Sequence, residues 1–247
     1  AFAEAIDLQK NQKYDEAKKL YEKILKRDSK DANARHLIAL IYMAEGNFNE
    51  AKKNIEIAID QAPDQPIFHS NYGALLHSMG NHQEAVVALE KSIKLDDKLF
   101  QSYYSLGIVY SDLNQNEKAV EAYHKALDVN NKSAAAHNNL ANLLSNTNNL
   151  EAEYHYKKLV ELEPTEVYPR LNMANYYIKR DQFNEAISSL NELVDMGIAT
   201  KEVFNSLGVS YKGLNDTKNA ISMFEEAIKI DKDFVLANEN LKLLKND

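Results

Sequence analysis

YYSLGIVYSDLNQNEKAVEAY, residues 103–123, is the stretch of sequence that decides the fold. Its apolar and small residues fall three and four positions apart, as Leu106, Gly107 and Tyr110 do, so they share one face of a helix. The Asn-rich segment at 114–116 interrupts this spacing, and Asn tolerates the left-handed conformation that ends many helices. A second helical pattern follows. The stretch therefore predicts two helices joined by a tight turn.

The same pattern recurs along the whole chain. The alanine that follows the turn repeats every 34 residues, with one interval of 33, at Ala17, Ala51, Ala85, Ala119, Ala152, Ala186 and Ala220. A fixed period of this length indicates stacked units, each of which buries its apolar faces against its neighbours. We expect one array over residues 1–247, with seven repeats and a capping helix at about 1–31, 32–65, 66–99, 100–133, 134–166, 167–200, 201–234 and 235–245.

The clearest copies, at residues 106–110 and 207–211, have the form Leu-Gly-x-x-Tyr, and each is followed by Ala-x-x-x-aromatic. This pattern resembles the tetratricopeptide repeat, or TPR. The resemblance covers essentially the whole chain. It implies an all-α fold, a right-handed TPR solenoid of antiparallel helix pairs with a C-terminal capping helix. It also implies that the first helices of successive repeats line a concave groove.

The packing and the turns follow from the same register. Gly or Ala recurs on the first helices, where it would let the second helix approach closely, at positions 39, 73, 107, 141, 174 and 208. Turn residues fall between the paired helices, at 46–47, 80–81, 114–116, 148–149 and 181–182. Repeat five is one residue shorter than the others, so we expect a tightened corner near Leu150.

Composition excludes several classes of function. The 247 residues include only 4 Pro and 7 Gly, too few for a β protein with many tight turns. The formal net charge of −8 repels phosphate backbones, so we expect no nucleic-acid partner. Without Cys there is no disulfide and no thiolate metal site. No apolar run approaches the roughly 18 residues of a membrane span, so we expect no membrane insertion. We also expect a cytoplasmic location, although the lack of Cys does not fix the compartment.

The residues of the first helices that avoid the packing stripe are the candidate binding residues. One column of them is neutral and mostly polar: Leu37, Asn71, Ser105, Asn139, Asn172, Ser206 and Asn240. An Asn amide offers donors and an acceptor, so it can pair with the backbone of an extended peptide without reading its side chains. The predicted peptide-binding residues are Asn71, Ser105, Asn138, Asn139, Asn142, Asn172, Asn175 and Asn205.

This column resembles the asparagine ladder in the TPR superhelix of O-linked N-acetylglucosamine transferase, and residues 136–141, Ala-His-Asn-Asn-Leu-Ala, carry that resemblance. Ser105, Ser206 and Leu37 depart from the ladder. A second interpretation stays open, because the chain has 27 Asn and some would fall on any exposed face.

No motif in the sequence indicates catalysis. His36 and His77 could reach the groove, but neither belongs to a ligand-spaced motif such as H-E-x-x-H. His69 and His137 stand at aromatic packing positions. We therefore predict no catalytic residue, no metal site and no cofactor.

Three functions fit the sequence. The first is a protein-interaction scaffold that binds an extended or helical segment of a protein or peptide partner in the groove. The second is the substrate-recruiting TPR arm of a larger enzyme, such as a glycosyltransferase, whose catalytic domain lies outside these residues. The third is self-association through the ends of the solenoid, which the degraded first repeat would favour.

Overall fold

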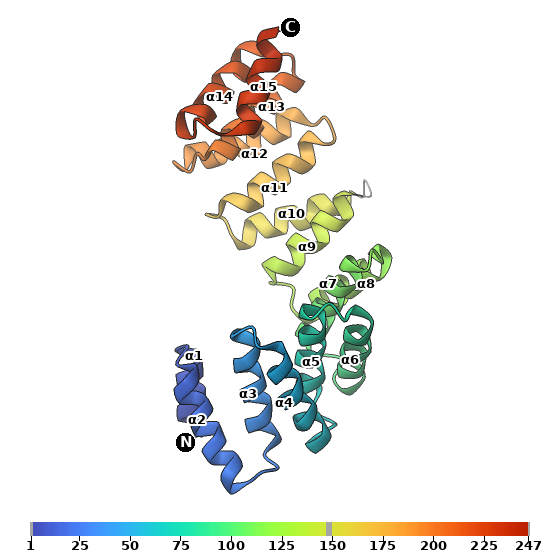
Figure 1. Cartoon of the computed structure of the whole chain (residues 1–247). Coiled ribbons are helices and arrows are strands. Elements are labelled where there is room, and N and C mark those ends of the chain that lie inside the picture. Colours follow the sequence, from blue (N-terminus) through green and yellow to red (C-terminus); the bar gives the residue numbers. More distant parts are fainter. Residues whose placement is uncertain (1, 147–149, 247) are drawn as a thin grey trace. The chain divides into compact units, whose positions relative to one another are not determined.

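The computed structural model describes residues 2–146 and 150–246. Over these ranges the chain forms fifteen α-helices and no β-strand (Figure 1). The predicted all-α fold is confirmed. Contacts within the chain define two compact units, Ala1–Asn131 and Lys132–Asp247, and each is described by itself.

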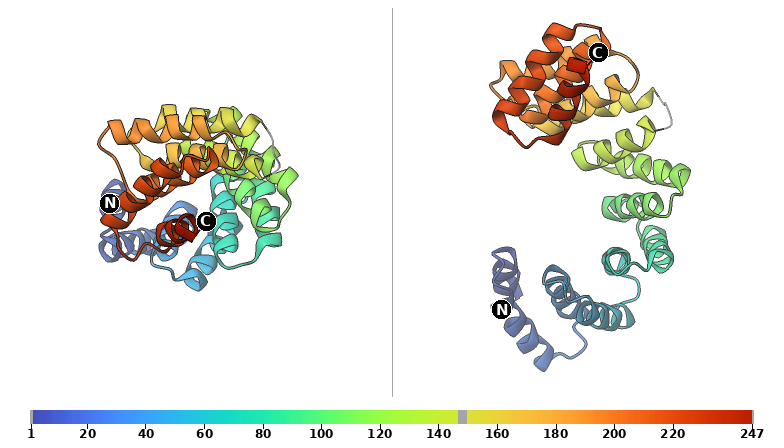
Figure 2. Two further views of the ribbon diagram at one scale, coloured as in Figure 1. Left: turned by 90° about the horizontal axis from the view of Figure 1, so that it is seen from above. Right: turned by 45° about the horizontal axis from the view of Figure 1, so that its top comes forward.

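The first unit contains four helix pairs. Its helices are α1 (Phe2–Lys10), α2 (Tyr14–Arg27), α3 (Ala32–Ala44), α4 (Phe48–Gln61), α5 (Pro66–Ser78), α6 (His82–Leu95), α7 (Phe100–Asp112) and α8 (Asn116–Val129). Inside this unit α2 contacts α3, α4 contacts α5 and α6 contacts α7, so the pairs stack in chain order (Figure 2).

The second unit contains three helix pairs and a final single helix. Its helices are α9 (Ala134–Ser145), α10 (Glu151–Leu162), α11 (Val167–Ile178), α12 (Phe183–Asp195), α13 (Lys201–Gly213), α14 (Thr217–Ile230) and α15 (Val235–Asn246). Contacts between α10 and α11, α12 and α13, and α14 and α15 continue the same stacking inside this unit.

The turn inside a pair ends the first helix with a residue in the left-handed conformation. The φ angle is +72° at Gly46, +81° at Gly80, +57° at Asn114 and +56° at Asp181, all at predicted turns. The next N–H then reaches back to the last helical turn, as Asn47 N does to the Tyr42 carbonyl oxygen at 2.8 Å. These turn predictions are confirmed. The turn predicted at 148–149, within the expected tightened corner, lies outside the described residues.

Close approach of paired helices depends on the small residues. The alanines of the repeating series, from Ala17 to Ala220, are all fully buried. A Cβ added to Gly107 would lie 2.6 Å from the Tyr123 ring, and one on Gly208 would lie 2.5 Å from the Phe224 ring. Any side chain at these positions would push the partner ring away. The predicted interlocking of large and small residues is confirmed.

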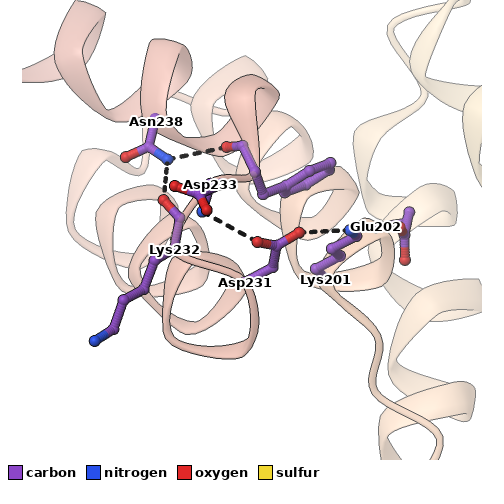
Figure 3. A network of polar contacts seen from close by, with 7 residues as sticks. Lys201, Glu202, Asp231, Lys232, Asp233 and Asn238 are labelled. Carbon is purple, nitrogen blue, oxygen red and sulfur yellow. Dashed lines mark hydrogen bonds and ion pairs between the residues drawn. The ribbon is translucent and has the colours of Figure 1, made fainter.

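The capping helix α15 is docked through the corner that precedes it (Figure 3). Lys201 Nζ, at the start of α13, donates to Asp231 Oδ2 at 2.6 Å, which fixes the end of α14. Asn238 Nδ2 on α15 donates to the carbonyl oxygen of Lys232 at 3.0 Å. These contacts order the corner that leads into α15, and Ala237 and Leu241 of α15 pack in one apolar cluster with Phe224 of α14. The sequence places a capping helix here.

Candidate functional site

Predicted binding residues take part in hydrogen bonds between successive first helices, and between the last first helix and the capping helix. In the second unit, Asn172 Nδ2 on α11 donates to Asn138 Oδ1 on α9 at 3.0 Å. In the same way Asn240 Nδ2 on α15 donates to Asn205 Oδ1 on α13 at 3.1 Å. Each of these amides therefore satisfies part of its hydrogen bonding inside the protein. We call these contacts the inter-repeat links.

The first unit contains an inter-repeat link of different composition. Asn71 Nδ2 on α5 lies 2.8 Å from His36 Nε2 on α3, and the neutral imidazole accepts this bond. His36 is only 6% exposed and its ring lies against that of Phe68, with centroids 4.4 Å apart. Burial lowers the pKa of His36 to about 4, so the ring is neutral at physiological pH.

The remaining predicted residues differ in their exposure. Ser105 on α7 is buried and accepts a bond from Gln101 Nε2 at 3.1 Å. Asn139 on α9 is half-buried, whereas Asn142 and Asn175 are exposed.

A pocket of about 410 Å³ lies among α9, α10 and α11, inside the second unit. Its lining residues are Asn142, Ser145, Asn146, Tyr156, Asn172, Asn175, Tyr176, Ile178 and Lys179. Three of the predicted binding residues therefore surround one pocket. Of the lining residues only Lys179 is charged, so polar neutral groups dominate its surface.

Two buried tyrosines line this pocket. Tyr156 and Tyr176 are each 3% exposed, and their ring centroids are 5.5 Å apart. Tyr156 Oη donates to Asn142 Oδ1 at 2.7 Å, and burial raises the pKa of Tyr156, which keeps the phenol protonated. The Tyr176 hydroxyl is buried and has no hydrogen-bond partner among the described residues.

An unpartnered buried hydroxyl is unfavourable, at a cost of roughly 1–3 kcal/mol. A ligand group that bonded to Tyr176 Oη would remove that cost. The lining therefore combines Tyr176 with the amide side chains of Asn172 and Asn175, and it contains one cation.

Tyr156, Tyr176 and Lys179 were not among the predicted peptide-binding residues. Tyr176 had a signal, because the equivalent positions of the second, third and fourth repeats hold the aliphatic residues Ile41, Leu75 and Val109. The seventh repeat also has a hydroxyl there, at Ser210. Tyr156 stands at the aromatic packing position of the second helix, where nothing in the sequence distinguishes its role from packing.

The helix pairs repeat in one register, pack closely through small residues and carry polar side chains on their first helices. These features define a helical-repeat protein. The chain belongs to the tetratricopeptide repeat family. Models described as tetratricopeptide repeat match residues 8–75, 64–132, 104–166 and 202–234, which together make up more than half of the chain.

Solved structures of low sequence identity share the fold. The C-terminal part of a TPR repeat-containing protein from Cytophaga hutchinsonii superposes with a TM-score of 0.80 at 17% identity, over 98% of this chain and 99% of that chain. YrrB, described as a TPR protein with an unusual peptide-binding site, gives a TM-score of 0.66 at 23% identity over 76% of this chain and 97% of its own.

The curated relatives that match are longer than this chain. The BBSome complex member BBS4 of Bos taurus is 20% identical over 209 residues, which are 84% of this chain and 40% of that protein. The chain spans less than half the length of the curated relatives it matches. In the described part of the chain no helix is both long enough and apolar enough to cross a membrane.

Proposed function

We propose that this chain is a protein-interaction scaffold, and that the pocket among α9, α10 and α11 contacts the backbone of a partner's peptide segment. Membership of the TPR family and the likeness to TPR structures support the scaffold role. The proposal that this pocket contacts a peptide backbone rests on one observation. The Tyr176 hydroxyl is buried and has no described partner, and Tyr176 lines the pocket together with three predicted Asn residues.

The pocket's chemistry suits a neutral main-chain ligand. Peptide N–H and C=O groups need an acceptor and a donor, and a hydroxyl or a primary amide supplies both. Asn175 is exposed, and the only bond described for its side chain is a long one, in which Ser206 Oγ donates to its Oδ1 at 3.5 Å. Asn172 uses one amide hydrogen in its inter-repeat link and keeps its carbonyl oxygen as an acceptor.

Charge argues against recognition by ion pairing at this place. Lys179 is the single cation of the lining, so a partner segment with several carboxylates could form few ion pairs there. YrrB, which shares the fold, is described as having a peptide-binding site, and this likeness supports the proposal that this chain also holds a peptide.

The test begins with peptides selected on the whole chain from a phage-displayed library of unstructured sequences. Their affinity is then measured by fluorescence anisotropy for the wild type and for Tyr176→Phe and Asn175→Ala. We expect each change to weaken binding about fivefold, because each removes about one hydrogen bond of roughly 1 kcal/mol.

Tyr176→Phe is the sharper variant, since the hydroxyl has no described partner in the protein and its removal leaves the melting temperature unchanged or slightly raised. Tyr154→Phe on α10 is the matched control, because Tyr154 is 55% exposed and is not part of the lining. Equal affinity of the wild type and Tyr176→Phe, or a library that yields no binder, would overturn the proposal.

A further inference from the structure

Three side chains that could ligate a metal meet at one corner of the first unit. His77 lies in the last turn of α5, His82 is the first residue of α6, and Asp112 is the last residue of α7. One donor atom from each lies within 4.8 Å of the other two. We propose that His77, His82 and Asp112 bind a divalent transition-metal ion, with Zn²⁺ as the best fit.

The distances are close to those of a metal site. Zn²⁺ lies about 2.0–2.2 Å from imidazole nitrogen and carboxylate oxygen, which places tetrahedral ligand atoms roughly 3.3 Å from one another. His77 Nε2 and Asp112 Oδ2 are 2.6 Å apart, and the rings of His77 and His82 have centroids 5.2 Å apart. Small side-chain rotations therefore convert the cluster into three ligands.

The local environment favours a cation at this point. Asp112 stands at the C-terminal end of α7, where the helix dipole already places partial negative charge. A carboxylate there is unfavourable unless a positive charge lies beside it. Because imidazole ligands are neutral, the positive charge of the metal ion is available to offset the negative charge of the carboxylate and of the helix end.

One ring of the cluster lacks a described partner. His82 Nδ1 is buried and has no hydrogen bond among the described residues. The side chains of His77 and Asp112 are 25% and 51% exposed, so an ion can enter from solvent. Three protein ligands leave a fourth tetrahedral position for water or for a group from another molecule.

Such an ion would join helices of two successive repeats. His77 and His82 flank the turn of the third repeat, and Asp112 ends the first helix of the fourth. An ion that binds this folded corner and not the unfolded chain raises stability by mass action. The site would therefore make the stability of the first unit depend on metal concentration.

The test is isothermal titration of the whole chain with ZnCl₂ at pH 7.5, together with thermal unfolding followed by circular dichroism. The wild type should bind one Zn²⁺ at this corner and melt at a higher temperature in Zn²⁺ than in EDTA. His82→Ala and Asp112→Asn should each weaken binding at least tenfold, because the loss of even an outer-shell partner of a metal site costs about 10–100-fold in affinity. Asp60→Asn, an exposed carboxylate near the end of α4, is the matched control and should leave the affinity unchanged.

The alternative is that His77 and Asp112 form only a hydrogen bond and bind no metal ion. In that case the wild type gives no heat and no shift in melting temperature with a large excess of Zn²⁺, and the proposal fails. It also fails when His77→Ala/His82→Ala binds Zn²⁺ as the wild type does, because the ion then sits elsewhere. Since these residues lie near the surface, circular dichroism without metal shows whether each variant is folded. Substitution by Co²⁺ gives a second readout, a visible absorption band typical of tetrahedral coordination that His82→Gln should abolish.

Discussion

Inside each unit, hydrogen bonds link successive first helices at equivalent repeat positions, but the acceptor group differs between the units. In the second unit, the inter-repeat links run from one Asn amide to another, as in Asn172 to Asn138. In the first unit, Asn71 donates to the ring nitrogen of His36, which stands at the position equivalent to Asn138. The same backbone arrangement thus accepts either an amide or an imidazole as the acceptor.

This difference separates what all repeats share from what each unit adds. The buried alanines and close helix contacts occur in both units, so packing is common to them. Amides do not titrate, whereas the buried imidazole of His36 does, with a pKa of about 4. The first unit therefore carries a dependence on pH that the links of the second unit lack.

The largest expected effect tests the shared packing. Ala119→Glu in the first unit and Ala186→Glu in the second should each lower the free energy of unfolding by about 3–5 kcal/mol, because both alanines are fully buried and the new carboxylate would be crowded and unpaired. Urea unfolding measures the loss. Asn184→Glu on the exposed side of α12 is the control and should change stability by less than about 0.5 kcal/mol. A large loss in one unit and a small one in the other would break the claim of common packing.

The second-largest expected effect is a dependence of stability on pH that arises from His36 in the first unit. The pKa of His36 is lowered from 6.5 to about 4, so between these values the unfolded chain binds the proton and the folded chain does not. Stability therefore falls as the pH drops from about 6.5 to 4, by up to about 3 kcal/mol at 1.36 kcal/mol per unit of pKa.

His36→Asn would copy the amide acceptor of the second unit and remove this titration. Urea unfolding at pH 7 and pH 4 should show that the variant loses less stability on acidification than the wild type. An equal loss in both proteins would mean that His36 is not the group that titrates.

The fold followed from the sequence because its determinants are local and repeated. Gly107 and Ala119 recur at a fixed period, and each position has one steric role that does not depend on distant parts of the chain. The turn residues were equally readable, since Gly46 and Asn114 adopt the left-handed conformation that their residue types predict.

The candidate site was only partly readable. The repeat length predicted Asn142, Asn172 and Asn175 as binding residues, and they line one pocket. The repeat length could not predict that Asn172 donates an amide hydrogen to Asn138. Whether a side chain faces a ligand or its neighbouring helix depends on rotamers and on the spacing between helices, which sequence period does not encode. The role of these residues in peptide binding stays a prediction.

The cluster at the corner of α5, α6 and α7 was unreadable for a related reason. His77 and His82 are five residues apart across a turn, and Asp112 comes one repeat later, so no short motif contains all three. Only the stacking of consecutive repeats brings them together.

The smallest expected effect tests a neutral link of the second unit. Asn172→Ala removes the bond to Asn138 and should cost about 1 kcal/mol, but Ala also gains up to roughly 0.7 kcal/mol in helix propensity. Asn191→Ala, at an exposed position inside α12, has the same gain without a described link and is the matched control. The difference in unfolding free energy between the two variants then measures the link alone. Because neither amide titrates, this difference should be the same at pH 7 and pH 4. A difference that changes with pH would show that a titrating group contributes to this link.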